Sequence, residues 1–285
     1  MNSKNCIILR TNYIDECIEN KAIHIEKITG YDVIICIDCI FSDIQYNLKC
    51  KFVKLTKEFL LENGLLILNN TGWLCGDYSY YCVSKTFGDY EFYWMIEPDV
   101  FLNFDDPNIF KKIDDFNNNN FDYISSYFNK ANEGWYWTKI IGMFYEKQLY
   151  SSFFAITRIS KKSIKYLMID RLRLSNMFYI NNNGQFPNDE SFVATSLMNG
   201  DFKCCDINYF GDFYSKETLN YAIPFSLTLL ESGKKDNKIY HPALSGLDFM
   251  RKVKKSIDEG YINDSNIEKI HKPFEVEKQL LGLIV

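Results

Sequence analysis

In the first third of the chain, segments with a strand-like run of apolar residues alternate with segments whose apolar residues recur at helical spacing. Residues 6–10 and 32–40 are short runs of Ile, Val, Leu and Cys, a pattern typical of strands buried on both faces. Residues 15–28 place apolar side chains at helical spacing, and Gly30 follows as a stop signal. Further elements predicted in this way are helices over 54–63 and 72–87 and a strand over 90–102.

The second half of the chain is less regular, but it also contains both strand-like and helix-like segments. The elements predicted here are strands over 151–157 and 238–241 and helices over 160–174 and 188–199. Two Asn-rich stretches, 114–120 and 181–184, predict a loop and a turn. Strands that alternate with helices favour an α/β fold: a mixed, mostly parallel central sheet flanked by helices.

Composition narrows the class of protein. Of the 285 residues 47% are hydrophobic, which is enough for a substantial core. Lys and Arg number 32 against 37 Asp and Glu, so the net charge is −5, and we expect no nucleic-acid partner. The nine cysteines include no pair of motifs with zinc spacing and predict reduced thiols. The N-terminal residues do not match a signal peptide, and no apolar run reaches the ~20 residues of a spanning helix, so we expect a soluble, cytoplasmic protein.

The most informative stretch is the acidic end of the predicted strand 90–102. An apolar and aromatic run leads into Glu97, Pro98 and Asp99. Pro98 cannot donate to a sheet ladder, and in extended backbone residues 97 and 99 point to the same face. Two neighbouring carboxylates repel each other unless a cation lies between them, and hard oxygen ligands suit Mn²⁺ or Mg²⁺. The alternative interpretation is a solvated acidic loop that continues to residues 105–106.

Residues 93–100, Tyr-Trp-Met-Ile-Glu-Pro-Asp-Val, resemble the Y-W-R-[VI]-E-P-x-V segment of the fungal α-mannosyltransferase family and of related bacterial glycosyltransferases. Weaker likenesses follow in a compatible order at 186–192 and at 240–242, a late Tyr-His-Pro. Ala155 stands where the fungal family carries an acidic residue, so the resemblance provides no nucleophile there.

The resemblance implies a GT-A fold and a metal-dependent glycosyltransferase. The donor would be a UDP- or GDP-linked sugar, and the acceptor a hydroxyl of a glycan or glycolipid. Residues 1–104 would form the nucleotide-sugar half and 105–260 the acceptor half of one catalytic domain, followed by a tail, 261–285. The apolar end of that tail predicts docking on the body of the chain, on a second copy as a homodimer, or on a membrane surface.

Individual candidates follow, each with a structural alternative. Glu97 and Asp99 would hold the metal with His241 as a third ligand, although a lone His is also common as a hydrogen-bonded structural residue. Asp189 or Glu190 would deprotonate the acceptor, as the resemblance favours, or would only offset the dipole of a helix that Asn188 caps.

Four polar residues are candidates for contacts with the donor. Arg10, Thr11 and Asp38 follow predicted strands, where ligands of parallel sheets bind, and the alternative is an ordinary strand exit. Asp77 lies in the first turn predicted for helix 72–87. The aromatic cluster at 135–137 suits stacking on a sugar or core packing.

Two other functions stay open on the sequence. A nucleotidyl- or phosphotransferase would share the acidic metal site, and a non-catalytic carbohydrate-binding protein would use the aromatic surface. The chain has no G-x-G-x-x-G, P-loop or G-x-S-x-G motif, which disfavours dehydrogenases, P-loop ATPases and serine hydrolases.

Overall fold

The structure is a computed structural model, and it describes residues 4–116, 120–181 and 184–282. It divides into two compact units. The first unit comprises the chain up to Pro98 together with Phe110–Tyr209, and the second comprises Asp99–Ile109 and the chain from Phe210 onward. The predicted division at residues 104 and 260 stays a prediction.

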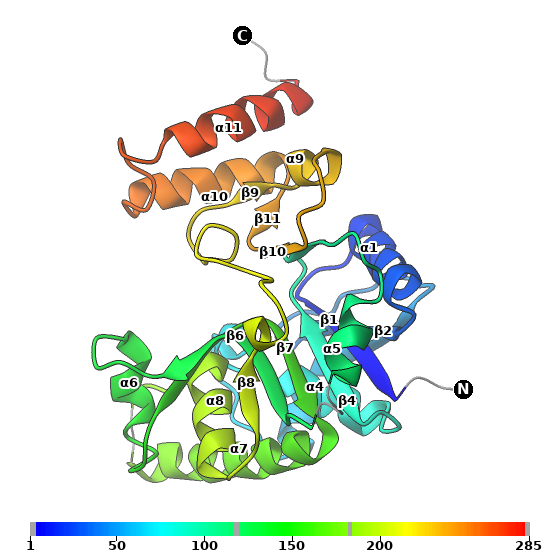
Figure 1. The fold of residues 1–285 in the computed structure, drawn as a ribbon. Helices are drawn as coiled ribbons and strands as arrows, with labels where there is room; N and C mark the ends of the chain where they lie inside the picture. Colours follow the sequence, from blue (N-terminus) through cyan, green and yellow to red (C-terminus); the bar gives the residue numbers. More distant parts are fainter. Residues whose placement is uncertain (1–3, 117–119, 182–183, 283–285) are drawn as a thin grey trace. The chain divides into compact units, whose positions relative to one another are not determined.

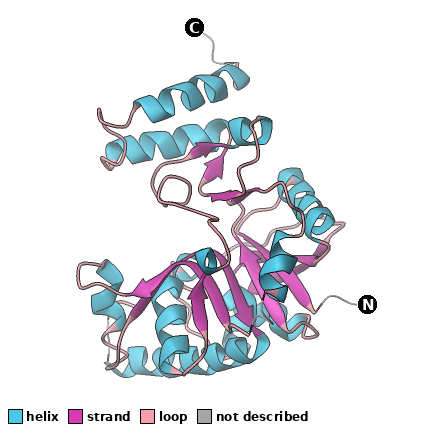
Figure 2. Ribbon diagram, viewed as in Figure 1, coloured by secondary structure: helices cyan, strands magenta, loops and turns pink. Residues whose placement is uncertain are grey.

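A seven-stranded sheet forms the centre of the first unit, with strand order β3-β2-β1-β4-β7-β6-β8 (Figures 1 and 2). Strand β1 pairs in parallel with β2 and with β4, whereas β7 runs antiparallel to both its neighbours. The predicted α/β fold with a mixed, mostly parallel sheet flanked by helices is therefore confirmed. The elements of this unit are β1 (Asn5–Thr11), α1 (Glu16–Thr29), β2 (Asp32–Cys39), β3 (Lys51–Thr56), α2 (Lys57–Glu62), α3 (Thr71–Leu74), α4 (Tyr78–Thr86), β4 (Phe92–Ile96), α5 (Ile109–Asp115), β6 (Tyr123–Lys130), α6 (Tyr136–Ile141), β7 (Tyr150–Ser160), α7 (Lys161–Asn181), α8 (Asp189–Asn199), β8 (Cys204–Asp206) and the 3₁₀ turn η1 (Ile207–Tyr209).

The sheet is buried on both faces, as its apolar strands predict. Cys6 and Ile8 of β1 belong to the main core with the tyrosines of α4, and their neighbours Ile7 and Leu9 are equally buried on the opposite face. Helix α1 ends where expected: Gly30 adopts a left-handed conformation (φ 68°), and its N–H bonds the carbonyl of Glu26. All nine cysteines are free thiols.

Three predicted boundaries were wrong. Residues 54–63 are not one helix, because β3 pairs with β2 as far as Thr56, whose hydroxyl then caps α2. The helix predicted over 72–87 is broken between Leu74 and Tyr78. The strand predicted over 90–102 becomes β4 and β5, separated at Pro98.

The second unit is smaller and is built from two separate stretches of chain. Strand β5 pairs antiparallel with β10, and β11 pairs in parallel with β9. Helices α10 and α11 enclose a core of Phe249, Val253, Ile262 and Ile270. Its elements are β5 (Phe101–Asn103), β9 (Phe225–Ser226), α9 (Leu227–Ser232), β10 (Lys238–Tyr240), β11 (Ala243–Leu244), α10 (Gly246–Asp258) and α11 (Glu268–Leu280).

Some predictions fall on parts that the structure does not describe. These are residues 117–119 of the Asn-rich loop, 182–183 of the Asn turn, and 283–285 at the end of the predicted docking segment. Among the described helices, none has both the length and the apolar character that crossing a bilayer requires.

Candidate functional site

The site lies at the carboxyl ends of β1 and β4, where the strand order changes direction. In open α/β sheets ligands bind at such a switch point. Arg10 is at the end of β1, and Glu97 directly follows β4. Because Leu9 pairs with Ile96, the next residues of the two strands also lie side by side. Arg10 Nη1 is 3.1 Å from Glu97 Oε1, and the other Arg10 amino group donates to the carbonyl of Gly72.

Asp189, the first residue of α8, approaches the same guanidinium. Its Oδ2 lies 3.8 Å from Arg10 Nη1 and accepts from the N–H of Gly76 at 3.0 Å, while Oδ1 accepts from the N–H of Glu190. Only 5% of Asp189 is exposed. Burial raises the pKa of the Asp189 carboxyl well above its usual value, and Arg10 opposes that rise. A buried carboxyl with a perturbed pKa beside a strand-end cluster is a candidate for an acid–base role.

Gly76 explains why the predicted helix is broken before α4. A Cβ at this position would lie 2.2 Å from Arg10 Nη1 and 2.4 Å from Asp189 Oδ2. The turn therefore needs a glycine, so that its N–H can reach the Asp189 carboxylate. The hydrogen bond from Gly76 to Asp189 therefore joins the turn between α3 and α4 to the N-terminus of α8.

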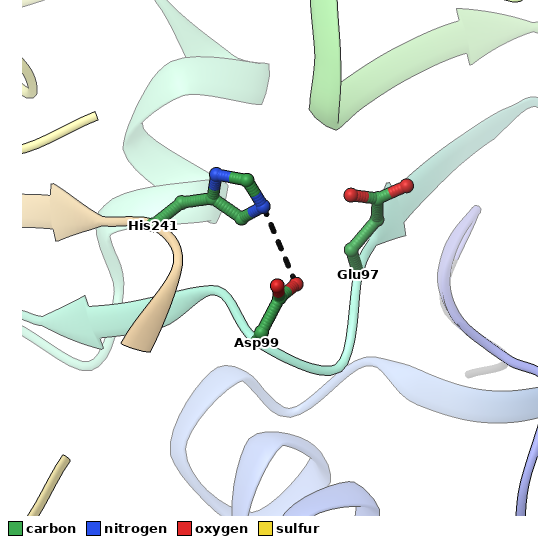
Figure 3. A group of neighbouring side chains, drawn as sticks. All are labelled: Glu97, Asp99 and His241. Carbon is green, nitrogen blue, oxygen red and sulfur yellow. Dashed lines mark ion pairs between the residues drawn. The ribbon is translucent and has the colours of Figure 1, made fainter. Parts of the chain in front are cut away.

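Asp99 and His241 form a second part of the site. His241 Nε2 is 3.4 Å from Asp99 Oδ1 (Figure 3). The backbone fixes both residues, because the N–H of Ala243 donates to the Asp99 carbonyl at 2.7 Å and the N–H of His241 donates to the Thr218 carbonyl at 3.0 Å. His241 Nδ1 lies 2.7 Å from the carbonyl oxygen of Asn220. A carbonyl oxygen only accepts, so Nδ1 carries a proton.

Glu97 completes a group of three side chains that can hold a metal ion. Glu97, Asp99 and His241 each offer one ligand atom, and these atoms lie within 4.8 Å of one another. Figure 3 shows the two carboxylates on the same side of the chain, although residues 98 and 99 form a turn and not the extended backbone on which the prediction rested. The backbone N–H of Glu97 bonds the carbonyl of Ala155 across the sheet. Ala155 of β7 therefore lies beside Glu97.

The other candidates have local partners. The Thr11 hydroxyl is buried and donates to the carbonyl of Tyr13. Asp38 accepts from the N–H of Ile40 and lies against Gly72, where a Cβ would be 2.0 Å from its Oδ2. Glu190 accepts from the side-chain amide of Asn188, which also caps α8 as expected.

Asp77 is wholly buried in an ion pair that the sequence analysis missed. Its two oxygens accept from Arg171 Nε at 2.9 Å and from Nη2 at 2.6 Å, and the Tyr81 hydroxyl donates to it as well. Arg171 Nη1 donates to the carbonyl of Pro187 at 2.9 Å. The sequence does contain a signal for this role. Arg171 occupies the apolar stripe of α7 formed by residues 164, 167 and 174, where a cation needs a buried partner.

Comparisons with known proteins give remote similarities in structure. No protein-family model matches the chain, and no curated protein matches it. One similar structure is a glycosyltransferase involved in glycosylation of the major capsid of PBCV-1, with a TM-score of 0.41, 12% identity and coverage of 90% of this chain and 100% of that one. Another is core-mannan synthase A of Aspergillus fumigatus in its Mn/GDP form, with a TM-score of 0.40, 14% identity and coverage of 73% of each chain.

Proposed function

We propose that the protein is a metal-dependent glycosyltransferase that moves a sugar from a nucleoside-diphosphate sugar to a hydroxyl of a glycan or glycolipid. The observation that carries this proposal is the group of Glu97, Asp99 and His241 after β4. Glu97 of this group directly follows β4 and pairs with Arg10 of β1, at the carboxyl ends of the strands, where sheets of this type bind their ligands.

The chemistry of the three side chains fits a divalent cation. Because Nδ1 of His241 faces the carbonyl of Asn220, Nε2 is the ring nitrogen that faces Asp99 Oδ1, and in a neutral imidazole it can donate its lone pair to a metal ion. A lone pair and a carboxylate that face each other repel unless a cation or a proton lies between them. A histidine whose other nitrogen donates to a backbone carbonyl is also the usual arrangement of a metal-binding histidine. Two carboxylates and one imidazole suit Mn²⁺ better than Mg²⁺, which prefers oxygen alone.

Arg10 provides fixed positive charge beside this group. Burial lowers the pKa of Arg10, but the carboxylates of Glu97 and Asp189 more than offset this, and the guanidinium stays charged. When bound, a divalent cation would offset the negative charge of a diphosphate leaving group. Arg10 lies within reach of the same phosphates and would add two charge-assisted hydrogen bonds.

Asp189 is the proposed base that takes the proton of the acceptor hydroxyl. Its carboxylate is oriented by two backbone N–H groups, those of Gly76 and Glu190. Glu190 is the second candidate for this role, because it follows Asp189 at the same helix start. No residue of β7 carries a carboxylate that could form a covalent intermediate, so we propose inversion with Asp189 as the base.

The test combines nucleotide binding with product analysis. We expect UDP or GDP with Mn²⁺ to raise the melting temperature, since a ligand at 100 times its Kd adds about 2.7 kcal/mol to the free energy of unfolding. Asp99→Asn should abolish the shift and the transfer of sugar. Asp105→Asn, which changes an exposed carboxylate just after β5, is the matched control and should behave as the wild type.

The products separate the alternatives. Release of free nucleoside diphosphate supports sugar transfer, release of pyrophosphate indicates nucleotidyl transfer, and glycan binding without nucleotide affinity indicates a carbohydrate-binding protein. Turnover at the wild-type rate in Asp99→Asn would refute the metal site. Cytoplasmic location, peripheral membrane contact and a homodimer stay predictions.

A further inference from the structure

Three aromatic side chains gather on the surface of the first unit. Trp73 of α3 is 65% exposed and Tyr136 of α6 is 61% exposed. Trp137 lies between them and is half-buried against the main core. Its ring centroid is 5.7 Å from that of Trp73 at an interplanar angle of 50°, and 5.0 Å from that of Tyr136 at 78°. We call Trp73, Tyr136 and Trp137 the aromatic platform.

The platform is tied to the proposed catalytic cluster through two short connections. Trp73 follows Gly72, whose carbonyl accepts from Arg10, and precedes Gly76, whose N–H bonds Asp189. On the other side, Gln185 donates to the Tyr136 hydroxyl at 2.9 Å and lies four residues before Asp189 along the chain. Short chain segments on both sides therefore connect the platform to the residue that would deprotonate the acceptor.

The shape and chemistry of the platform suit a sugar ring. The C–H bonds of a pyranose are weakly positive and are attracted to the negative face of an aromatic ring, while its hydroxyl groups need donors and acceptors at the edge. The Tyr136 hydroxyl and the exposed amide of Gln185 supply those groups. A flat nucleobase stacks best between parallel faces, and the tilt of these rings offers no such slot.

We propose that the aromatic platform of Trp73, Tyr136 and Trp137 is the subsite that binds a pyranose ring of the acceptor glycan. The identification of this glycan as the acceptor rests on the proposed glycosyltransferase function. The stacking itself needs neither metal nor nucleotide, so it can be measured separately.

Saturation-transfer NMR on the whole protein tests the subsite, with EDTA present to remove metal ions. The probes are the methyl glycosides of glucose, galactose, mannose and N-acetylglucosamine, together with their disaccharides. We expect saturation of the C–H protons on one face of at least one sugar. Trp73→Ala should weaken that binding roughly 2- to 12-fold, the effect of one aromatic contact, and Trp73→Phe should restore part of it.

The control is Tyr209→Ala, which removes a tyrosine with the same 61% exposure as Tyr136 but with ring contacts to Phe116 and Phe121. Sugar signals that survive in Tyr209→Ala and vanish in Trp73→Ala/Tyr136→Ala support the proposal. Signals absent for every sugar, or unchanged in that double variant, overturn it.

A nucleotide arm separates this proposal from the proposed function. Wild-type protein is titrated with UDP and with GDP in the presence of Mg²⁺. Loss of nucleotide signals in Trp73→Ala with intact sugar signals would overturn the subsite, because the ring would then belong to the donor. A wild-type protein that binds sugars but neither nucleotide, with Mg²⁺ here and with Mn²⁺ in the melting assay, would refute the proposed function and leave the sugar result as evidence for the platform.

Discussion

The buried ion pair between Arg171 and Asp77 offers the sharpest test of how the site is held. Both side chains are fully buried, and the pair is bidentate. The guanidinium also stacks 3.8 Å from the ring centroid of Phe192 in α8. Arg171→Met keeps most of the side-chain volume but leaves the Asp77 carboxylate buried beside the Tyr81 hydroxyl alone. Removing one partner of a buried pair costs about 3–5 kcal/mol.

Urea unfolding followed by circular dichroism measures this loss. We expect the double variant Asp77→Leu/Arg171→Met to recover most of the stability, because no charge then stays buried without a partner. The matched control is Arg173→Met on the same helix, where a partly exposed pair with Asp170 is worth only ~0–1 kcal/mol. The reasoning is refuted if Arg171→Met costs no more than Arg173→Met.

The same double variant separates stability from positioning. Arg171 bonds the carbonyl of Pro187, two residues before Asp189, and Asp77 adjoins Gly76, which also bonds Asp189. We therefore expect the double variant to fold and yet transfer sugar at least 10-fold more slowly, since small misplacements of a base have large effects on rate. Nucleotide affinity should change little, because Glu97 and Asp99 are untouched. Wild-type turnover would show that Arg171 stabilises the fold without orienting Asp189.

Three further predictions concern the cluster around Asp189. Burial raises the pKa of the Asp189 carboxyl, so the stability that its protonated form contributes is full below the unfolded pKa of about 4 and is lost as the pH rises through the native pKa. Urea unfolding should therefore show that Asp189→Asn gains stability relative to the wild type as the pH rises above about 4; a pH-independent difference would contradict this. Gly76→Ala should impair transfer far more than Gly134→Ala, whose nearest atom would be 3.4 Å from the added Cβ, as initial rates would show. Arg10→Met should weaken binding of nucleoside diphosphate about 10-fold in calorimetry, because it removes a charge-assisted phosphate contact, whereas equal affinities would exclude Arg10 from the donor site.

The parts of the fold that the sequence predicted well are those that local periodicity determines. The two strands at 6–10 and 32–40 and the helix at 15–28 bury apolar residues at fixed spacing, and Gly30 marks the helix end. The boundary at residue 56 failed because a partner strand, and no local signal, keeps residues 54–56 extended. The break at Gly76 likewise depends on Asp189, 113 residues further along the chain.

The site was predictable only in part, for a related reason. The apolar run that leads into Glu97, Pro98 and Asp99 predicts a metal site from the local sequence alone, before the fold is known. The cluster of Arg10, Glu97 and Asp189 depends on the adjacency of β1 and β4 and on the packing of α8, which no local pattern encodes. Which ring nitrogen of His241 faces Asp99 depends on a single backbone carbonyl, that of Asn220.

The pairing of β5 with β10 has a consequence for synthesis on the ribosome. Asn103, the last residue of β5, bonds Asp236, 133 residues later, so β5 emerges long before its partner has been translated. Until then its edge is exposed, and closing so long a loop is slow. A nascent chain stopped at residue 209 would contain all seven strands of the central sheet, but β5 would lack its partner β10. We expect such a fragment to be far more prone to aggregation than the full chain, because unpaired strand edges template association.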